Sequence, residues 1–164
     1  MPSLQQEMTA FFEAHAQRRP ADVVTIGSGM FELHSADGDL TSAFERGRAF
    51  QQALADAGLA ALSVPTEYGG RGLDPEVEQL LHEVSADYEV PHPMPLSVGL
   101  GLAVPTLLAH GTEAQRQRHV AATLRADQIW CQLFSEPEAG SDLASLRTTA
   151  RLDGDHWVVD GQKV

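Results

Sequence analysis

The chain has 164 residues and a formal net charge of −12, because 23 Asp and Glu residues outnumber 11 Lys and Arg residues. This acidity argues against a nucleic-acid-binding protein, which needs a basic surface to displace counterions from phosphates. It also argues against a polybasic membrane anchor. The single cysteine, Cys131, excludes an internal disulfide, and the length permits one domain, or one domain and part of a second.

The sequence shows no targeting or membrane-spanning segment. Residues 1–20 contain two glutamates and no unbroken apolar run, so a secretory signal is not expected. The most apolar stretch, 96–109, is broken by glycine and proline and is shorter than the roughly 20 apolar residues that a span needs. We expect no membrane span and, from the lack of a targeting peptide, a cytoplasmic location.

Apolar residues recur at helical spacing over 4–18 and 43–57, which predicts two amphipathic helices. An S-x-x-Q capping box precedes the first helix, and an S-x-x-E box at Ser42 precedes the second. Gly58 is the expected C-cap of the second helix. Between them, residues 20–40 lack a helical period, and we expect a loop there with at most one short strand.

The next residues predict a loop and three further helices. Glycines make 64–75 rich in turns. Asp74 and Pro75 favour the start of a third helix, which we expect the prolines between 91 and 95 to end. The two remaining helices, an apolar one interrupted at Pro105 and a partly exposed one, are expected at 96–110 and 113–124.

From residue 128 onward, β-formers replace the helical pattern. Strands are expected at 129–135, 146–152 and 156–159, with another beginning at 162–164, and Asp153-Gly154 is a hairpin signal. We therefore expect an α+β chain with an all-α domain at 1–126 and an incomplete β domain at 127–164. Because its last strand has barely begun, we expect an N-terminal piece of a longer chain; the alternative is that another chain supplies the missing strands.

Generic motifs give little chemistry. The GxG at 27–29 lacks the third glycine of a dinucleotide fingerprint, and the seven histidines show no metal-ligand spacing. We expect Cys131 to be a small buried apolar side chain. Glu136 and Glu138 lie close enough in sequence for an acid–base pair, but carboxylates around a loop proline are usually solvated. We assign no metal ligand.

The stretch WCQLFSEPEAGSD at 130–142 is more informative. Its small residues let a ligand approach the backbone closely, and its N–H groups and serine hydroxyls suit a polar or anionic planar group. The alternative interpretation is an ordinary tight connection between two strands.

Four segments resemble the acyl-CoA dehydrogenase family, in the order that the family has them. They are VPTEYGGRGL at 64–73, PTLLAHGTEAQRQRHV at 105–120, LFSEPEAGSDLAS at 133–145 and DGDHWVVDGQKV at 153–164. The resemblance implies a helical N-terminal domain, a β-barrel-like middle domain and a C-terminal helical domain that these residues do not include.

The resemblance further implies FAD as cofactor and α,β-desaturation of an acyl-CoA thioester, with hydride passing to flavin N5. It implies an electron-transfer flavoprotein as acceptor and a homo- or hetero-oligomer of dehydrogenase subunits. Since the family's catalytic glutamate lies in the C-terminal region, we assign no catalytic residue in this chain and expect it to be inactive alone.

The family's cofactor contacts fall on Gln132, Leu133, Phe134, Ser135, Gly140 and Ser141. By resemblance, Ser135 hydrogen-bonds the isoalloxazine ring, Ser141 also lies by the CoA part of the substrate, and residues around 92–102 line the acyl pocket. The family usually has smaller residues than Leu133 and Phe134, so we expect a reshaped flavin face or weaker flavin binding. It often has glycine in place of Glu138, so we expect a different loop geometry at that position.

Two alternatives stay open. A divergent member of the family can serve as a non-catalytic partner subunit of a hetero-oligomeric dehydrogenase. Related flavoproteins act as oxidases or monooxygenases on non-CoA substrates.

Overall fold

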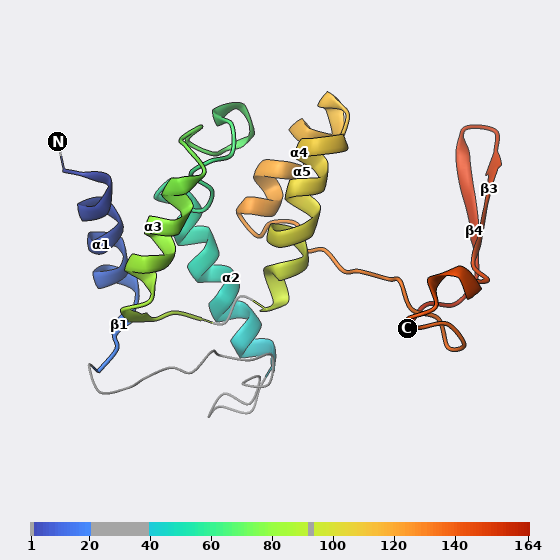
Figure 1. The fold of residues 1–164 in the computed structure, drawn as a ribbon, viewed down its shortest axis with the longest axis horizontal. Coiled ribbons are helices and arrows are strands. Elements are labelled where there is room, and N and C mark those ends of the chain that lie inside the picture. Colours follow the sequence, from blue (N-terminus) through green and yellow to red (C-terminus); the bar gives the residue numbers. More distant parts are fainter. Residues whose placement is uncertain (1, 21–39, 92–93) are drawn as a thin grey trace. The chain divides into compact units, whose positions relative to one another are not determined.

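The computed structural model describes residues 2–20, 40–91 and 94–164; most of the loop expected at 20–40 lies outside them. The chain divides into two compact units, Met1–Trp130 and Cys131–Val164 (Figure 1). The first is helical and the second contains a β-hairpin, so the α+β class is confirmed. The domain boundary predicted after residue 126 stays a prediction. Among the described helices, none is both long and apolar enough to cross a bilayer.

The first core of the helical unit lies between α1 (Leu4–His15), α2 (Leu40–Asp56) and α3 (Glu76–Ser85). Its buried members are Met8, Phe11, Phe12, Leu54, Leu59, Leu62 and Tyr88. The predicted capping box of α1 is confirmed, because the Ser3 N–H donates to Gln6 Oε1 at 2.8 Å and the Gln6 N–H to Ser3 Oγ at 3.3 Å. These bonds satisfy donors that the first helical turn leaves free.

Three predicted helix boundaries are wrong: the end of the first helix, the end of the third and the start of the second. The first helix stops at His15 because β1 (Gln17–Arg18) pairs antiparallel with β2 (Tyr88–Glu89). The same pairing explains why α3 ends before the prolines. The second helix begins at Leu40, so Ser42 lies inside it rather than at its N-cap, whereas Gly58 follows its end with φ +68°, as a C-cap requires.

The second core joins α4 (Val104–His110), α5 (Glu113–Leu124) and the 3₁₀ turn η1 (Thr66–Tyr68). Its buried residues are Ala61, Val64, Tyr68, Val104, Val120 and Leu124. The predicted break at Pro105 is wrong, because the helical segment continues through this proline, which lies in the first turn of α4, a position that tolerates proline. The irregularity precedes it: η2 (Met94–Leu96) is a 3₁₀ turn and η3 (Gly99–Ala103) is π-helical.

The glycine-rich loop before α3 is fastened by Arg71. Its guanidinium makes two hydrogen bonds with the Glu7 carboxylate, at 2.9 and 2.7 Å, and a third with the Ala57 carbonyl at 2.9 Å. The hydrogen bond from Arg71 lowers the pKa of Glu7. The loop therefore joins the start of α1 to the end of α2, which explains why a charged residue stands among glycines.

The smaller unit contains β3 (Thr149–Asp153) and β4 (His156–Asp160) in an antiparallel hairpin. Gly154 turns the chain with φ +65°, so the predicted hairpin is confirmed. The strands predicted at 129–135 and 162–164 are wrong: in the described part of the chain these residues form no ladder. A short 3₁₀ turn, η4 (Leu143–Ser145), lies before the hairpin.

The replacement Gly70→Ala is predicted to destabilise the helical unit by about 3 kcal/mol, the range of a severe backbone clash. A methyl group there would overlap the carbonyl of Val64 and lie 2.7 Å from the Ala61 oxygen. Urea unfolding followed by far-UV circular dichroism measures this change. Gly101→Ala is the matched control, since nothing lies within 4 Å of its added methyl, and it should leave stability unchanged or raise it by up to about 1 kcal/mol. Equal stabilities of the two variants would contradict the prediction.

Candidate functional site

The stretch 130–142, which the sequence singles out, contains a tight turn at 136–139. The Glu136 N–H donates to the Ala139 carbonyl at 2.8 Å, and the Ala139 N–H donates back to the Glu136 carbonyl at 3.1 Å. Pro137 and Glu138 lie at the exposed tip, while Glu136 and Ala139 are buried. The sequence folds this way because proline fixes its own φ at a value suited to turns.

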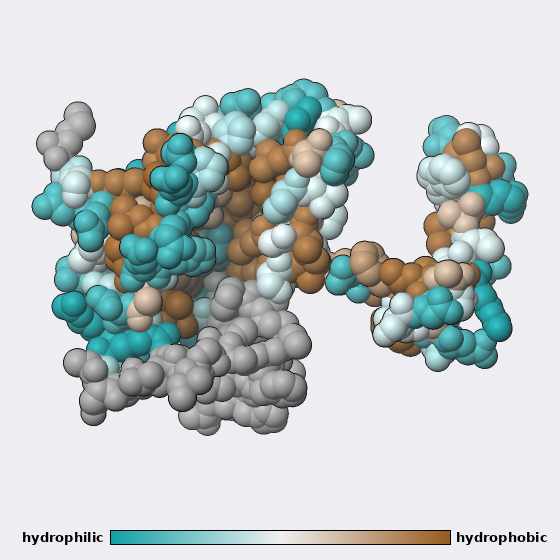
Figure 2. Space-filling view, in the orientation of Figure 1, coloured by the Kyte–Doolittle hydropathy of each residue, from teal (hydrophilic) through white to brown (hydrophobic). Residues whose placement is uncertain are grey.

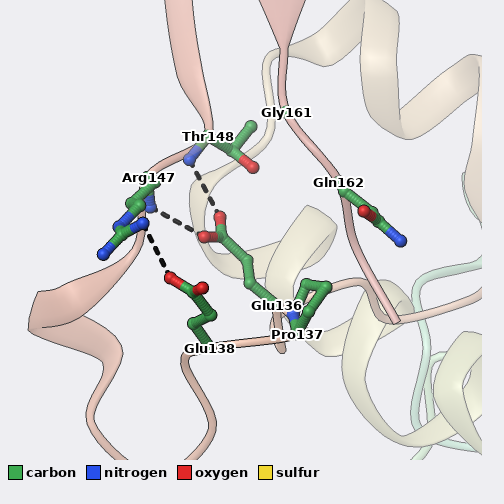
Figure 3. A pocket seen from close by; sticks show the side chains of 7 residues that line it. All are labelled: Glu136, Pro137, Glu138, Arg147, Thr148, Gly161 and Gln162. Atoms are coloured by element: carbon green, nitrogen blue, oxygen red, sulfur yellow. Dashed lines mark hydrogen bonds and ion pairs between the residues drawn. The ribbon is translucent and has the colours of Figure 1, made fainter.

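The buried carboxylate of Glu136 is the centre of this unit. Its two oxygens accept hydrogen bonds from the backbone N–H groups of Arg147, at 2.7 Å, and Thr148, at 2.9 Å (Figure 3). The Lys163 ammonium donates to the same carboxylate at 3.0 Å. The expectation that Glu136 is solvated is therefore wrong, since only 8 % of the residue is exposed.

These contacts keep Glu136 ionised. The Thr148 side chain, followed by the backbone N–H groups of Arg147 and Thr148, lowers the pKa of Glu136 from 4.5 to about 2, and Lys163 adds to the effect against the opposing cost of burial. A carboxylate with so low a pKa is a poor proton acceptor near neutral pH. Glu136 is therefore suited to holding structure rather than to acid–base catalysis.

Glu138 behaves differently from its neighbour. It is exposed, as expected, and pairs with the Arg147 guanidinium at 2.7 Å on the surface. The two carboxylates thus contact the same residue, one at its backbone and one at its side chain (Figure 3). Exposed ion pairs of this kind contribute little stability, so the buried carboxylate dominates.

Two hydrogen bonds join the predicted flavin-contacting stretch to the segment after β4. Lys163 Nζ donates to the Phe134 carbonyl at 3.1 Å, and the Val164 N–H donates to the Ser135 carbonyl at 3.0 Å. Lys163 is mostly buried, with 22 % of its side chain exposed. Residues 134–136 and 163–164 are therefore brought together, although they are far apart in sequence.

A cavity of about 250 Å³ lies beside Glu136 (Figure 3). It is lined by Glu136, Pro137, Glu138, Arg147, Thr148, Gly161 and Gln162. Gly161 is needed for the close approach of two segments, because a side chain there would overlap Thr148. None of the predicted cofactor contacts lines this cavity.

The predicted cofactor contacts are mostly at the surface. Leu133 and Phe134 are 57 % and 55 % exposed, and Figure 2 shows apolar residues reaching the surface of this unit. Gln132 is exposed and Ser135 is half-buried. Among the residues that the structure describes, none accepts a hydrogen bond from the backbone N–H groups of 132–135. Open donors beside apolar side chains suit a planar ring with a polar edge, so this stretch fits an isoalloxazine group.

Gly140 and Ser141 follow the turn and are exposed. Within the described chain, no hydrogen bond joins either of them to 132–135. Space is open around the Gly140 Cα, which permits a ligand to approach the backbone there. Cys131, expected to be buried, is exposed instead.

The predicted acyl-pocket residues lie in the helical unit, apart from 92–93, which are outside the described residues. Gly99 is buried, and a methyl group on it would lie 3.0 Å from the Thr123 side chain and 3.2 Å from Trp130. Leu102 is 49 % exposed. A separate apolar cavity of about 180 Å³ includes Leu96. The described residues hold no group of three or more His, Cys, Asp or Glu that suits a metal.

Comparison with protein families matches residues 30–127 to the acyl-CoA dehydrogenase N-terminal domain, which is more than half of the chain. The chain belongs to the acyl-CoA dehydrogenase family.

Individual relatives agree with this assignment. The chain is 48 % identical over 122 residues to acyl-CoA dehydrogenase IpdE1 of Mycobacterium tuberculosis, covering 74 % of this chain and 31 % of that protein. It is 44 % identical over 161 residues to acyl-CoA dehydrogenase FadE34 of the same organism, covering 97 % of this chain and 22 % of that protein. The chain thus spans less than a third of the length of either relative.

The fold is similar to that in the crystal structure of the ChsE4–ChsE5 complex from Mycobacterium tuberculosis. The TM-score is 0.65 at 29 % identity, over 98 % of this chain and 36 % of the solved chain. This similarity extends through the hairpin unit as well as the helices.

The contacts of Glu136 are predicted to weaken as the pH falls from 4.5 toward 2. Because its pKa is lower in the folded chain than the usual 4.5, its contribution to stability is complete above pH 4.5 and is lost on protonation near pH 2. Backbone NMR shifts of Arg147 and Thr148 report this titration locally, apart from Glu7 and Glu113, whose pKa values are also lowered. A midpoint near 4.5, or an equal transition in Glu136→Gln, would contradict the assignment.

Proposed function

We propose that this chain forms the N-terminal part of an FAD-dependent acyl-CoA dehydrogenase, an oxidoreductase that introduces an α,β double bond into an acyl-CoA thioester. The observation that supports this most strongly is the run of open backbone donors at 132–135 beside two exposed apolar side chains. It occurs in a chain that belongs to a family of FAD-dependent dehydrogenases.

In this proposal the flavin supplies the hydride acceptor, and the chain binds and orients it. The N–H groups of 132–135 and the Ser135 hydroxyl bond the polar edge of the ring. Leu133 and Phe134 cover its apolar face and exclude water. Gly140 leaves room for close approach, and Ser141 bonds the cofactor and the CoA part of the substrate.

Residues of η2 and η3 contribute to the acyl pocket, and an electron-transfer flavoprotein takes up the electrons. We assign the catalytic base to no residue of this chain; the buried carboxylate of Glu136 has a low pKa and is held in three hydrogen-bonding and ionic contacts. We further propose a cytoplasmic location.

A second candidate function is a non-catalytic subunit that stabilises a longer dehydrogenase partner. It is favoured by the similarity to a chain of the ChsE4–ChsE5 complex. Exposed apolar side chains on the hairpin, among them Trp157 at 64 % and Val159 at 65 %, suit a surface that another chain covers.

The protein that carries this sequence, purified from its host under native conditions, should show flavin absorption in the visible range. Addition of an acyl-CoA without oxygen should bleach that absorption, because hydride reduces the flavin. A screen across short, long and polycyclic acyl groups identifies the substrate. A flavin that no acyl-CoA reduces would favour the oxidase or monooxygenase alternative, and a protein without flavin that copurifies with a longer homologue would favour the partner subunit.

Within that protein, Ser135→Ala is predicted to raise the dissociation constant for FAD about fivefold to tenfold, the effect of losing one hydrogen bond of roughly 1 kcal/mol. Ser85→Ala is the matched control, because it removes a hydroxyl that donates to the His82 carbonyl in α3, in the helical unit. Titration of the deflavinated protein by flavin fluorescence gives both constants. Equal constants for the two variants would remove Ser135 from the flavin site.

A further inference from the structure

Three separate segments of the smaller unit meet at the Glu136 carboxylate. The turn at 136–139 supplies the carboxylate itself, Arg147 and Thr148 supply two backbone N–H groups, and Lys163 supplies an ammonium group. The partners lie 11, 12 and 27 residues along the chain. The hydrogen bonds of the Glu136 side chain therefore join these three segments, as the ladder of a sheet joins its strands.

Residues 132–135 have few other constraints. Within the described chain they form no strand, and their backbone hydrogen bonds are those that the Phe134 and Ser135 carbonyls accept from Lys163 and Val164. Lys163 is held at Phe134 by its second bond, to Glu136. The conformation of the stretch therefore depends on the position of the Lys163 ammonium, and that position depends on Glu136.

The same contacts determine the direction of an open donor. A trans peptide directs its C=O and N–H to opposite sides, and the described chain contains no cis peptide bond. Because the Phe134 carbonyl points at Lys163, the N–H of Ser135 points away from it. That N–H belongs to the open donors of the proposed flavin site.

We propose that Glu136 is a positioning residue that acts through Lys163 to fix the direction in which residues 132–135 present their donors to a flavin. This inference rests on the proposed flavin site. Glu136 does not touch the ring in this account. It acts on the cofactor through the backbone of Phe134 and Ser135.

The first test uses the ¹⁵N-labelled 164-residue chain without cofactor. Glu136→Gln replaces one acceptor oxygen with an NH₂ group that faces donors, so amide protection at Arg147, Thr148 and Val164 should fall at least tenfold. The heteronuclear NOE of 132–135 should fall to values of a mobile segment. Signals of α5 serve as the internal reference that the variant is folded.

A second variant separates the contribution of Lys163 from that of Glu136, and a third variant is a control. Lys163→Met should mobilise 132–135 but leave the amides of Arg147 and Thr148 protected, because their bonds to Glu136 remain. Glu138→Gln is the matched control: it neutralises an exposed carboxylate on the same turn and should leave all these amides within twofold of the unaltered chain. Unchanged mobility of 132–135 in Glu136→Gln, or in Lys163→Met, would overturn the proposal.

The second test measures FAD affinity by flavin fluorescence in the protein purified from its host and in its variants. Glu136→Gln and Lys163→Met should each weaken FAD binding at least tenfold, and Glu138→Gln less than twofold. Unaltered affinity in a variant with a mobile 132–135 would overturn the positioning role. If the unaltered protein binds no FAD, the proposed function fails, whereas the NMR comparison still decides whether Glu136 positions the stretch.

Discussion

The buried Glu136 carboxylate is the interaction on which the smaller unit depends. A charge taken out of water is costly unless hydrogen bonds and opposite charge compensate it, and here two backbone N–H groups and Lys163 do so. Its low pKa is the consequence of that compensation. The hairpin of β3 and β4 has side chains exposed along both strands, so polar contacts rather than an apolar core hold this unit's segments together.

The helical unit is stabilised mainly by apolar packing. Two apolar clusters bury the facing sides of its helices. Polar contacts add to them: Arg71, in the loop before α3, reaches Glu7 in α1, and Gln51 in α2 reaches the Leu124 carbonyl at the end of α5, at 2.8 Å. Trp130 ends this unit, with its indole N–H donating to Thr123 at 2.8 Å. The chemistry that we propose lies outside this unit, in a segment with open donors.

Sequence reasoning succeeded where structure is decided locally. The capping box at Ser3 and the hairpin at Gly154 depend on residues within a few positions. It failed where pairing is distant: β1 ends the first helix early by pairing with β2, and the apolar residues at 129–135 find no ladder. Glu136 was missed as a buried group because its partners lie 11 to 27 residues away; a glutamate that precedes a proline turn gives no local sign of them. The predicted flavin contacts came from family resemblance, and they stay a prediction.

The most direct measurement of the central claim is a crystal structure of the protein purified from its host with flavin bound. We expect the polar edge of the isoalloxazine ring within about 3 Å of N–H groups among residues 132–135, with Glu136 still bonded to Arg147, Thr148 and Lys163. A ring that lies elsewhere, or one that contacts Glu136 directly, would contradict it.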